Sequence, residues 1–74
     1  MVNMYNRRHW VTINEKDYDA ADVILEKLYQ EGHIDSVRVD RSVGNGELMI
    51  GVECGWDDLL FMELTFDESG IVFH

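Results

Sequence analysis

The residue types that most often catalyse reactions or bind metals are few in this chain and widely separated. The chain has one cysteine, Cys54, and three histidines, His9, His33 and His74. A zinc site needs about four ligands that converge on one ion, and these residues have no metal-ligand spacing. Cys54 lies in the most acidic part of the sequence, where carboxylates oppose formation of the reactive thiolate. We therefore expect no metal site, no cofactor and no cysteine nucleophile.

Paired carboxylates are the other candidates for chemistry, because two of them can divide acid and base roles. Glu53 and the pair Asp57-Asp58 are close in sequence. A substrate pocket, however, typically needs about 300 Å³ or more with converging polar groups, and 74 residues leave little room for one. The glycines of residues 44–46 lead into a predicted strand, whereas a phosphate-binding loop leads into a helix. We predict that the protein is not an enzyme.

Charge is the most unusual feature of the chain. It holds 15 acidic and 6 basic residues, a formal net charge of −9. Residues 42–74 include 7 acids and no lysine or arginine. Such a polyanion is repelled by nucleic-acid phosphates and by anionic membranes, so we expect no direct binding to either. A partner that binds through electrostatics must present a basic surface.

Hydrophobic periodicity predicts the elements that position these charges. Aromatic and β-branched residues predict a first strand over residues 8–13, and alternating apolar residues predict strands over 36–40, 48–54 and 59–66. Beyond these four strands, residues 71–73 offer a short additional one. Between the first two strands, residues 17–31 carry apolar side chains at helical spacing. Asn14 or Asp17 can cap this helix, and Gly32 is placed to end it. Turn residues at 44–46 predict a hairpin.

This order predicts one small α+β domain over residues 1–74, with the order β-α-β-β-β. We expect a mainly antiparallel sheet with one helix packed on one face, and 46 % hydrophobic residues are enough for a core. A lone helix leaves the other face of the sheet uncovered. Apolar residues there would form a homodimer face, for which we select Met49, Leu59 and Phe61.

Four acids of the predicted helix fall within an arc of about 60°, directed away from the apolar stripe. They are Glu15, Asp19, Asp22 and Glu26, and we call them the acidic row. Like charges at neighbouring helical positions cost a few tenths of a kcal/mol each, and the helix dipole favours acids only in the first turn. Two interpretations stay open: a solvated face of an acidic protein, and carboxylates presented to a basic partner.

The C-terminal half supplies further candidates for the same partner. These are Glu53, Trp56, Asp57, Asp58, Glu63, Asp67 and Glu68. Carboxylates in rows can imitate a phosphate backbone and occupy a basic nucleic-acid channel. In size, acidity and compact α+β layout, the chain resembles the small acidic inhibitors that phages direct at host nucleases, polymerases and CRISPR effectors.

We therefore predict a small acidic, non-enzymatic, protein-binding inhibitor. Its most specific form is a phage-encoded nucleic-acid mimic, of the anti-CRISPR or anti-nuclease type, that blocks the basic surface of a nucleic-acid-binding enzyme. The alternative is a structural module that oligomerises through its open sheet face or an edge strand. One cysteine excludes an intramolecular disulfide, and we expect a cytoplasmic protein. No apolar run approaches the roughly 20 residues of a membrane helix.

Overall fold

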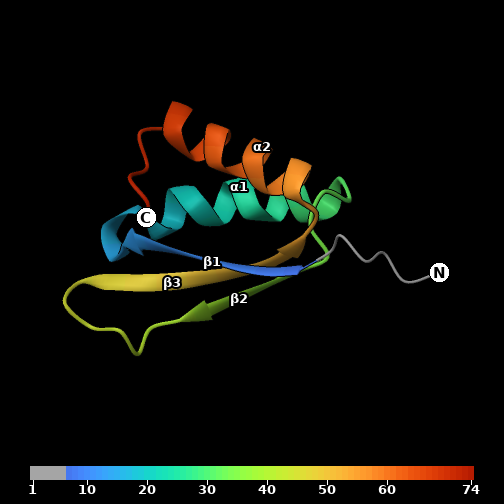
Figure 1. The fold of residues 1–74 in the computed structure, drawn as a ribbon. Coiled ribbons are helices and arrows are strands. Elements are labelled where there is room, and N and C mark those ends of the chain that lie inside the picture. Colours follow the sequence, from blue (N-terminus) through green and yellow to red (C-terminus); the bar gives the residue numbers. More distant parts are fainter. Residues whose placement is uncertain (1–6) are drawn as a thin grey trace.

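Strands and helices alternate along most of the described chain (Figure 1). The computed structural model describes residues 7–74, so the first six residues of the predicted domain lie outside the described part. In chain order the elements are β1 (Arg7–Asn14), a 3-10 turn (Glu15–Asp17), α1 (Tyr18–Gln30), β2 (Ser36–Asp40), β3 (Glu47–Cys54) and α2 (Trp56–Glu68). The order is therefore β-α-β-β-α.

β3 lies at the centre of a three-stranded sheet and pairs antiparallel with β1 on one side and β2 on the other. β1 and β2 are consequently parallel to each other, with β3 between them and α1 connecting them, as in a split β-α-β unit. Figure 1 shows both helices on the same face of the sheet and the opposite face open. The predicted α+β class and antiparallel pairing are confirmed, whereas a single covering helix is wrong.

The segment that follows β3 explains the difference. Alternation predicts a strand over residues 59–66, but this stretch belongs to α2. An almost unbroken apolar run fits both the strand and the helix period. Leucine, methionine and glutamate favour the helix, and Asp57 and Asp58 in its first turn complement the helix dipole.

Both helices end in the same glycine-based motif. After α1, the backbone N–H of His33 donates to the carbonyl of Leu28 over 2.9 Å, and the intervening Gly32 has a φ of +84°. Gly70, with a φ of +77°, ends α2 in the same way. A left-handed residue at this position satisfies carbonyls that the helix end leaves free, and glycine adopts it at least cost. The predicted end at Gly32 is confirmed.

The two outer edges of the sheet differ in whether a further segment of the described chain pairs with them. Thr12 of β1 exchanges two backbone hydrogen bonds with His74, of 2.8 and 3.0 Å, beside an isolated bridge between Ile13 and Phe73. The strand predicted over 71–73 is thus reduced to a single bridge. In the described part of the chain, β2 pairs only with β3, so its outer edge is the open one.

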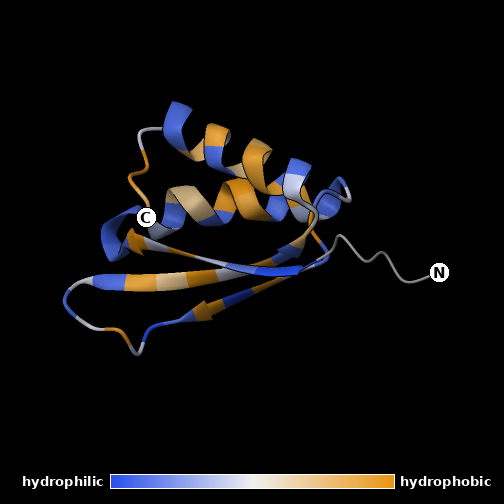
Figure 2. Cartoon of the chain, in the orientation of Figure 1, coloured by the Kyte–Doolittle hydropathy of each residue, from blue (hydrophilic) through white to orange (hydrophobic). Residues whose placement is uncertain are grey.

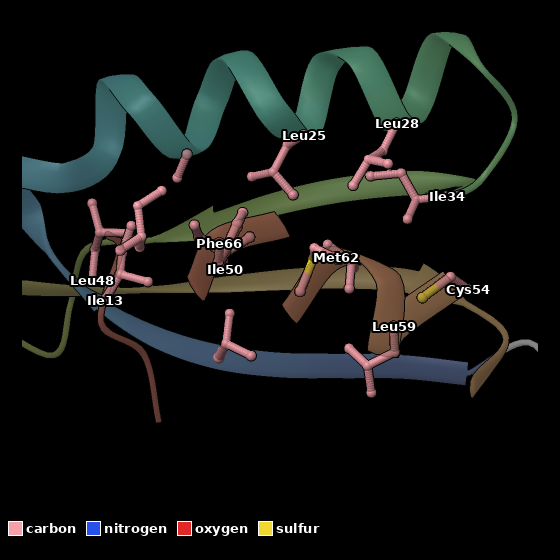
Figure 3. Packing of buried hydrophobic residues seen from close by; sticks show 14 residues of the cluster. Ile13, Leu25, Leu28, Ile34, Leu48, Ile50, Cys54, Leu59, Met62 and Phe66 are labelled. Carbon is pink, nitrogen blue, oxygen red and sulfur yellow. The ribbon is translucent and has the colours of Figure 1, made fainter. Parts of the chain in front are cut away.

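The core lies between the sheet and the two helices (Figure 3). Its buried side chains are Val11, Ile13, Ala21, Leu25, Leu28, Ile34, Leu48, Ile50, Val52, Cys54, Leu59, Met62, Phe66 and Ile71. Each large apolar side chain that leaves water contributes about 1.5–3 kcal/mol to folding. In β3, residues of even number point into this core, so those of odd number are placed on the open face.

Candidate functional site

The acidic row lies along one side of the first helical segment. Glu15 is in the 3-10 turn, Asp19, Asp22 and Glu26 are in α1, and all four are exposed. Oε1 of Glu15 lies 3.5 Å from Nη1 of Arg41, which partly neutralises it. The other three carboxylates form no ion pair within residues 7–74. Three negative charges therefore face solvent on one side of α1.

Two of these acids line a groove between α1 and the start of β2. The groove is an open hollow of about 430 Å³, which we call the acidic groove. Its lining consists of Asp22, Leu25, Glu26, Tyr29, Asp35, Ser36 and Val37. Three of these residues are acidic and none is basic, while leucine, tyrosine and valine supply apolar surface. The acidic groove thus combines negative charge, apolar contact and the open edge of β2.

The acids of α2 lie mainly at its two ends. Asp57 and Asp58 are in the first turn, where the positive end of the helix dipole favours them. Asp67 and Glu68 are in the last turn, and Glu63, partly buried, lies between the two pairs. None of these five lines the acidic groove. The structure therefore distributes the predicted acids over separate surfaces.

Glu53 and Trp56 contact residues outside the groove. Oε2 of Glu53 lies 4.0 Å from Nη2 of Arg8, and its Oε1 accepts a hydrogen bond from Ser36 Oγ over 3.4 Å. The Trp56 ring is tilted against the His9 ring, with 4.9 Å between centroids, and Trp56 remains 55 % exposed. Glu53 thus belongs to the open sheet face and Trp56 to the start of α2.

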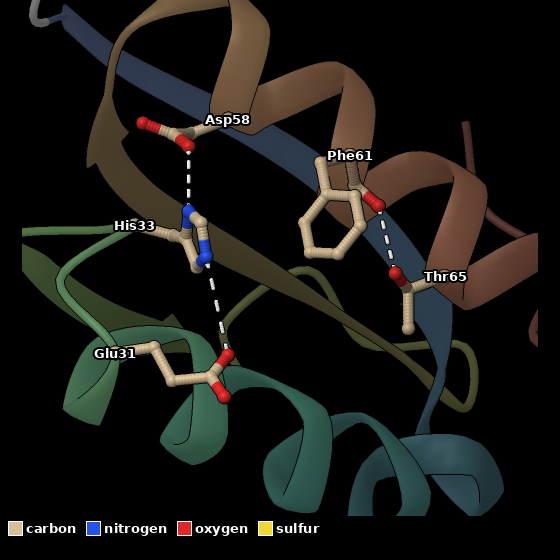
Figure 4. Close-up of polar contacts among 5 residues, drawn as sticks. All are labelled: Glu31, His33, Asp58, Phe61 and Thr65. Atoms are coloured by element: carbon tan, nitrogen blue, oxygen red, sulfur yellow. Dashed lines mark hydrogen bonds and ion pairs between the residues drawn. The ribbon is translucent and has the colours of Figure 1, made fainter.

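His33 connects the end of α1 to the start of α2 (Figure 4). Its Nδ1 lies 2.9 Å from Oδ1 of Asp58, and its Nε2 lies 3.9 Å from Oε1 of Glu31. The Phe61 ring packs beside the imidazole, 5.4 Å between centroids. A histidine held by a carboxylate resembles the base of a hydrolase. The nearby Thr65 hydroxyl, however, donates to the carbonyl of Phe61 over 2.8 Å, so its proton is directed at the backbone and not at His33.

Cys54 is also unsuited to nucleophilic chemistry. It is 1 % exposed, and burial raises the pKa of its thiol to about 11, with the carboxylates of Asp58 and Asp35 acting in the same direction. The thiol is therefore protonated at neutral pH. Within residues 7–74, no group of three or more histidine, cysteine or acidic side chains is arranged to hold a metal ion. No helix of this part of the chain has the length and apolar character of a membrane span.

The three residues predicted to form a dimer face do not lie on one face of the protein. Met49 is half-buried on the open sheet face, Leu59 is 6 % exposed in the core, and Phe61 is 46 % exposed on the outer side of α2. Side chains two residues apart share a face in a strand but point about 160° apart on a helix. The predicted grouping of Leu59 with Phe61 is wrong for this reason.

The open sheet face is mostly polar. Trp10 is paired in register with Gly51, and its indole covers that glycine so closely that a Cβ there would lie 2.9 Å from ring atoms. Charged residues surround this contact, among them Arg8, Arg38 and Glu53. Among residues 7–74, the apolar patch expected on this face is therefore confined to Trp10, 42 % exposed, and Met49.

Comparison of the chain with protein-family models, with curated proteins and with solved structures gave no match. The surfaces of the fold are therefore the features that bear on function. The acidic groove is the strongest of them, because charge, apolar contact and an unpaired strand edge meet there.

Proposed function

We propose that the protein is a small acidic, non-enzymatic binding module of the inhibitor type, which takes a basic segment of a partner protein into the acidic groove. One observation carries this proposal: Asp22 and Glu26 of α1 and Asp35 before β2 line one open hollow of about 430 Å³, and its lining within residues 7–74 includes no lysine or arginine. A cationic ligand placed in this hollow is attracted by negative charge from two sides of it.

The open edge of β2 specifies the form of the ligand. An edge strand presents backbone N–H and carbonyl groups that a further strand can pair with. A peptide added there gains affinity from main-chain hydrogen bonds and specificity from alternate side chains. Residues i and i+2 of such a strand are about 6.6 Å apart, close to the 5–6 Å between helical positions i and i+4. Basic residues at every second position therefore match Asp22 and Glu26.

The more specific form of this proposal is a nucleic-acid mimic that blocks a basic channel. From Glu15 to Glu26 the acidic row extends about 16 Å along the helix axis. Positive side chains that normally neutralise phosphates can neutralise these carboxylates instead. The bound module would then exclude nucleic acid from the partner's surface.

Self-association through the edge of β2 or the open sheet face is the rival function. Pairing two copies through β2 would bring two acidic grooves together, with Asp35 close to the interface of each copy. Repulsion between the two acidic surfaces opposes such a pairing. In the described part of the chain, exposed apolar surface on the open face is limited to Trp10 and its surroundings. The charge distribution therefore favours a basic partner over a second copy.

A matched pair of variants tests the groove. The probe is a labelled nine-residue peptide of alternating arginine and valine, titrated by fluorescence anisotropy at 50 and 200 mM salt. Asp22→Asn with Glu26→Gln should weaken binding at least tenfold, and the native affinity should fall as salt rises. The control, Asp67→Asn with Glu68→Gln, changes net charge equally and should alter affinity less than twofold. An equal loss of affinity in both variants would show that the peptide is attracted by net charge alone, and it would refute the acidic groove as the binding site.

The mimic form needs a separate readout. Proteins retained by the immobilised chain at low salt should be released by excess duplex DNA, and the Asp22 and Glu26 variant should retain fewer of them. If DNA releases none of them, the module binds basic proteins without imitating nucleic acid.

A further inference from the structure

α2 is apolar on both of its sides. Leu59, Met62 and Phe66 are buried against the sheet, whereas Leu60 and Leu64, on the outer side, are 59 % and 55 % exposed. A helix with one face in water normally carries polar residues there, and a helix that is apolar all round is normally buried. Figure 2 shows the middle of α2 coloured as hydrophobic between hydrophilic ends.

The exposed residues form one continuous stripe. Leu60 and Leu64 are four positions apart and Phe61 and Leu64 three, so each pair lies side by side on the helix surface. Phe61 also borders a hollow of about 210 Å³ between α1 and α2, together with Val23, which is 70 % exposed. We call Leu60, Phe61 and Leu64 of α2, together with the neighbouring Val23 of α1, the α2 stripe. A contiguous exposed apolar patch of this kind marks an interaction surface.

Charge around the α2 stripe decides what can cover it. At about 100° per residue, Asp57, Asp67 and Glu68 fall in the same arc of α2 as the exposed leucines, and all three are exposed. A second copy of α2 laid on the stripe would set these acids against one another, and α2 itself has no lysine or arginine to neutralise them. In the hollow beside Phe61, Lys27 and Glu31 of the α1 side both line the wall, so their formal charges cancel there. An anionic lipid surface meets the same repulsion.

We propose that the α2 stripe is a second docking surface, for an amphipathic helix of a partner protein that carries lysine or arginine along both sides of its apolar face. Its apolar residues, at i, i+3, i+4 and i+7, pack on Leu60 and Leu64, and one enters the hollow beside Phe61. Its basic flanks lie against the acids at the two ends of α2. This surface is distinct from the acidic groove and does not depend on it.

Two designed peptides serve as probes. Both are 18-residue helices with leucine at i, i+3, i+4 and i+7; one has lysine flanks and the other glutamate flanks. Titrated into the ¹⁵N-labelled full chain, the lysine peptide should shift the amide signals of the α2 stripe, and the glutamate peptide should bind at least tenfold more weakly. Leu60→Gln with Leu64→Gln should weaken the lysine peptide at least tenfold, with an unchanged circular dichroism spectrum because both positions are exposed.

Other results would overturn the proposal. Equal binding of both peptides would show that charge does not select the occupant, and full binding by the double glutamine variant would place the peptide elsewhere. Sedimentation as a dimer that the double variant dissociates would identify a second copy as the occupant. Binding to phosphatidylglycerol vesicles that the variant abolishes would identify a membrane. Asp22→Asn with Glu26→Gln should leave lysine-peptide binding intact, which separates this surface from the acidic groove.

Discussion

Leu59 and Leu60 are adjacent in the chain but lie in opposite environments, which makes them a sensitive test of the fold. Leu59 is 6 % exposed and Leu60 is 59 % exposed. Truncating a buried leucine to alanine typically costs 2–5 kcal/mol, part from lost burial and part from the cavity. Because Leu59 lies in the first half of α2, near the rim of the core, we expect Leu59→Ala to cost about 2–3 kcal/mol. A chain of this length is stabilised by roughly 4–11 kcal/mol in total.

Urea unfolding followed by circular dichroism measures the difference. With an unfolding slope of about 1 kcal/mol per molar urea, Leu59→Ala should lower the midpoint by about 2–3 M. Leu60→Ala should change stability by less than about 0.5 kcal/mol, because the site is exposed and alanine favours a helix. A strand over residues 59–66 with Leu60 inward would give the reverse ranking. A larger loss for Leu60→Ala than for Leu59→Ala would therefore refute α2 as described.

Three further outcomes are expected. Burial raises the pKa of the Cys54 thiol from 9.0 to about 11, so the folded state holds this proton more tightly than the unfolded state. The contribution of Cys54 to the free energy of unfolding should be constant below pH 8 and fall by about 2 kcal/mol between pH 9 and 11; in urea titrations, Cys54→Ala should lack this part of the fall. Gly51→Ala should displace the indole of Trp10, shift its N–H signal in NMR spectra and cost about 1 kcal/mol. Asp58→Asn should lower unfolding free energy by about 1 kcal/mol, since it weakens the hydrogen bond to His33 and removes a first-turn charge; an unchanged urea midpoint would contradict this.

Elements with local signals could be predicted from the sequence. The apolar repeat of 17–31 and Gly32 predict a helix and its end, and α1 covers Tyr18–Gln30 with that glycine behind it. The turn at 44–46 is confirmed, and Asn45 there has a φ of +59°. Alternation over 48–54 predicts β3 because one face of the strand is buried.

α2 could not be separated from a strand by periodicity alone. In residues 59–66 nearly every position is apolar. A buried face can therefore be drawn through this stretch with the period of a strand or with the period of a helix. Composition held a usable signal: the run contains only one β-branched residue, Thr65, and is rich in helix formers. The exposed Leu60 and Leu64 also weaken the helical pattern of the sequence, because they put apolar residues on the solvent side of α2, where polar residues are expected.

The acidic row could be predicted, but the acidic groove could not. Asp19, Asp22 and Glu26 follow from the helical period and one element. Asp35 joins two of them only because the split β-α-β topology brings the start of β2 beside α1. No pattern in the sequence sets that distance, and none shows that β2 is an open edge.

The acidic groove is the central claim, and amide mapping with the arginine–valine peptide tests it most directly. Titration into the ¹⁵N-labelled chain should shift signals of residues 35–40 and of Asp22 and Glu26, and should slow hydrogen exchange along β2. Trp10 on the open sheet face should be unaffected. Shifts confined to Trp10 and its neighbours, or saturable binding that leaves residues 35–40 unchanged, would contradict the assignment of the groove.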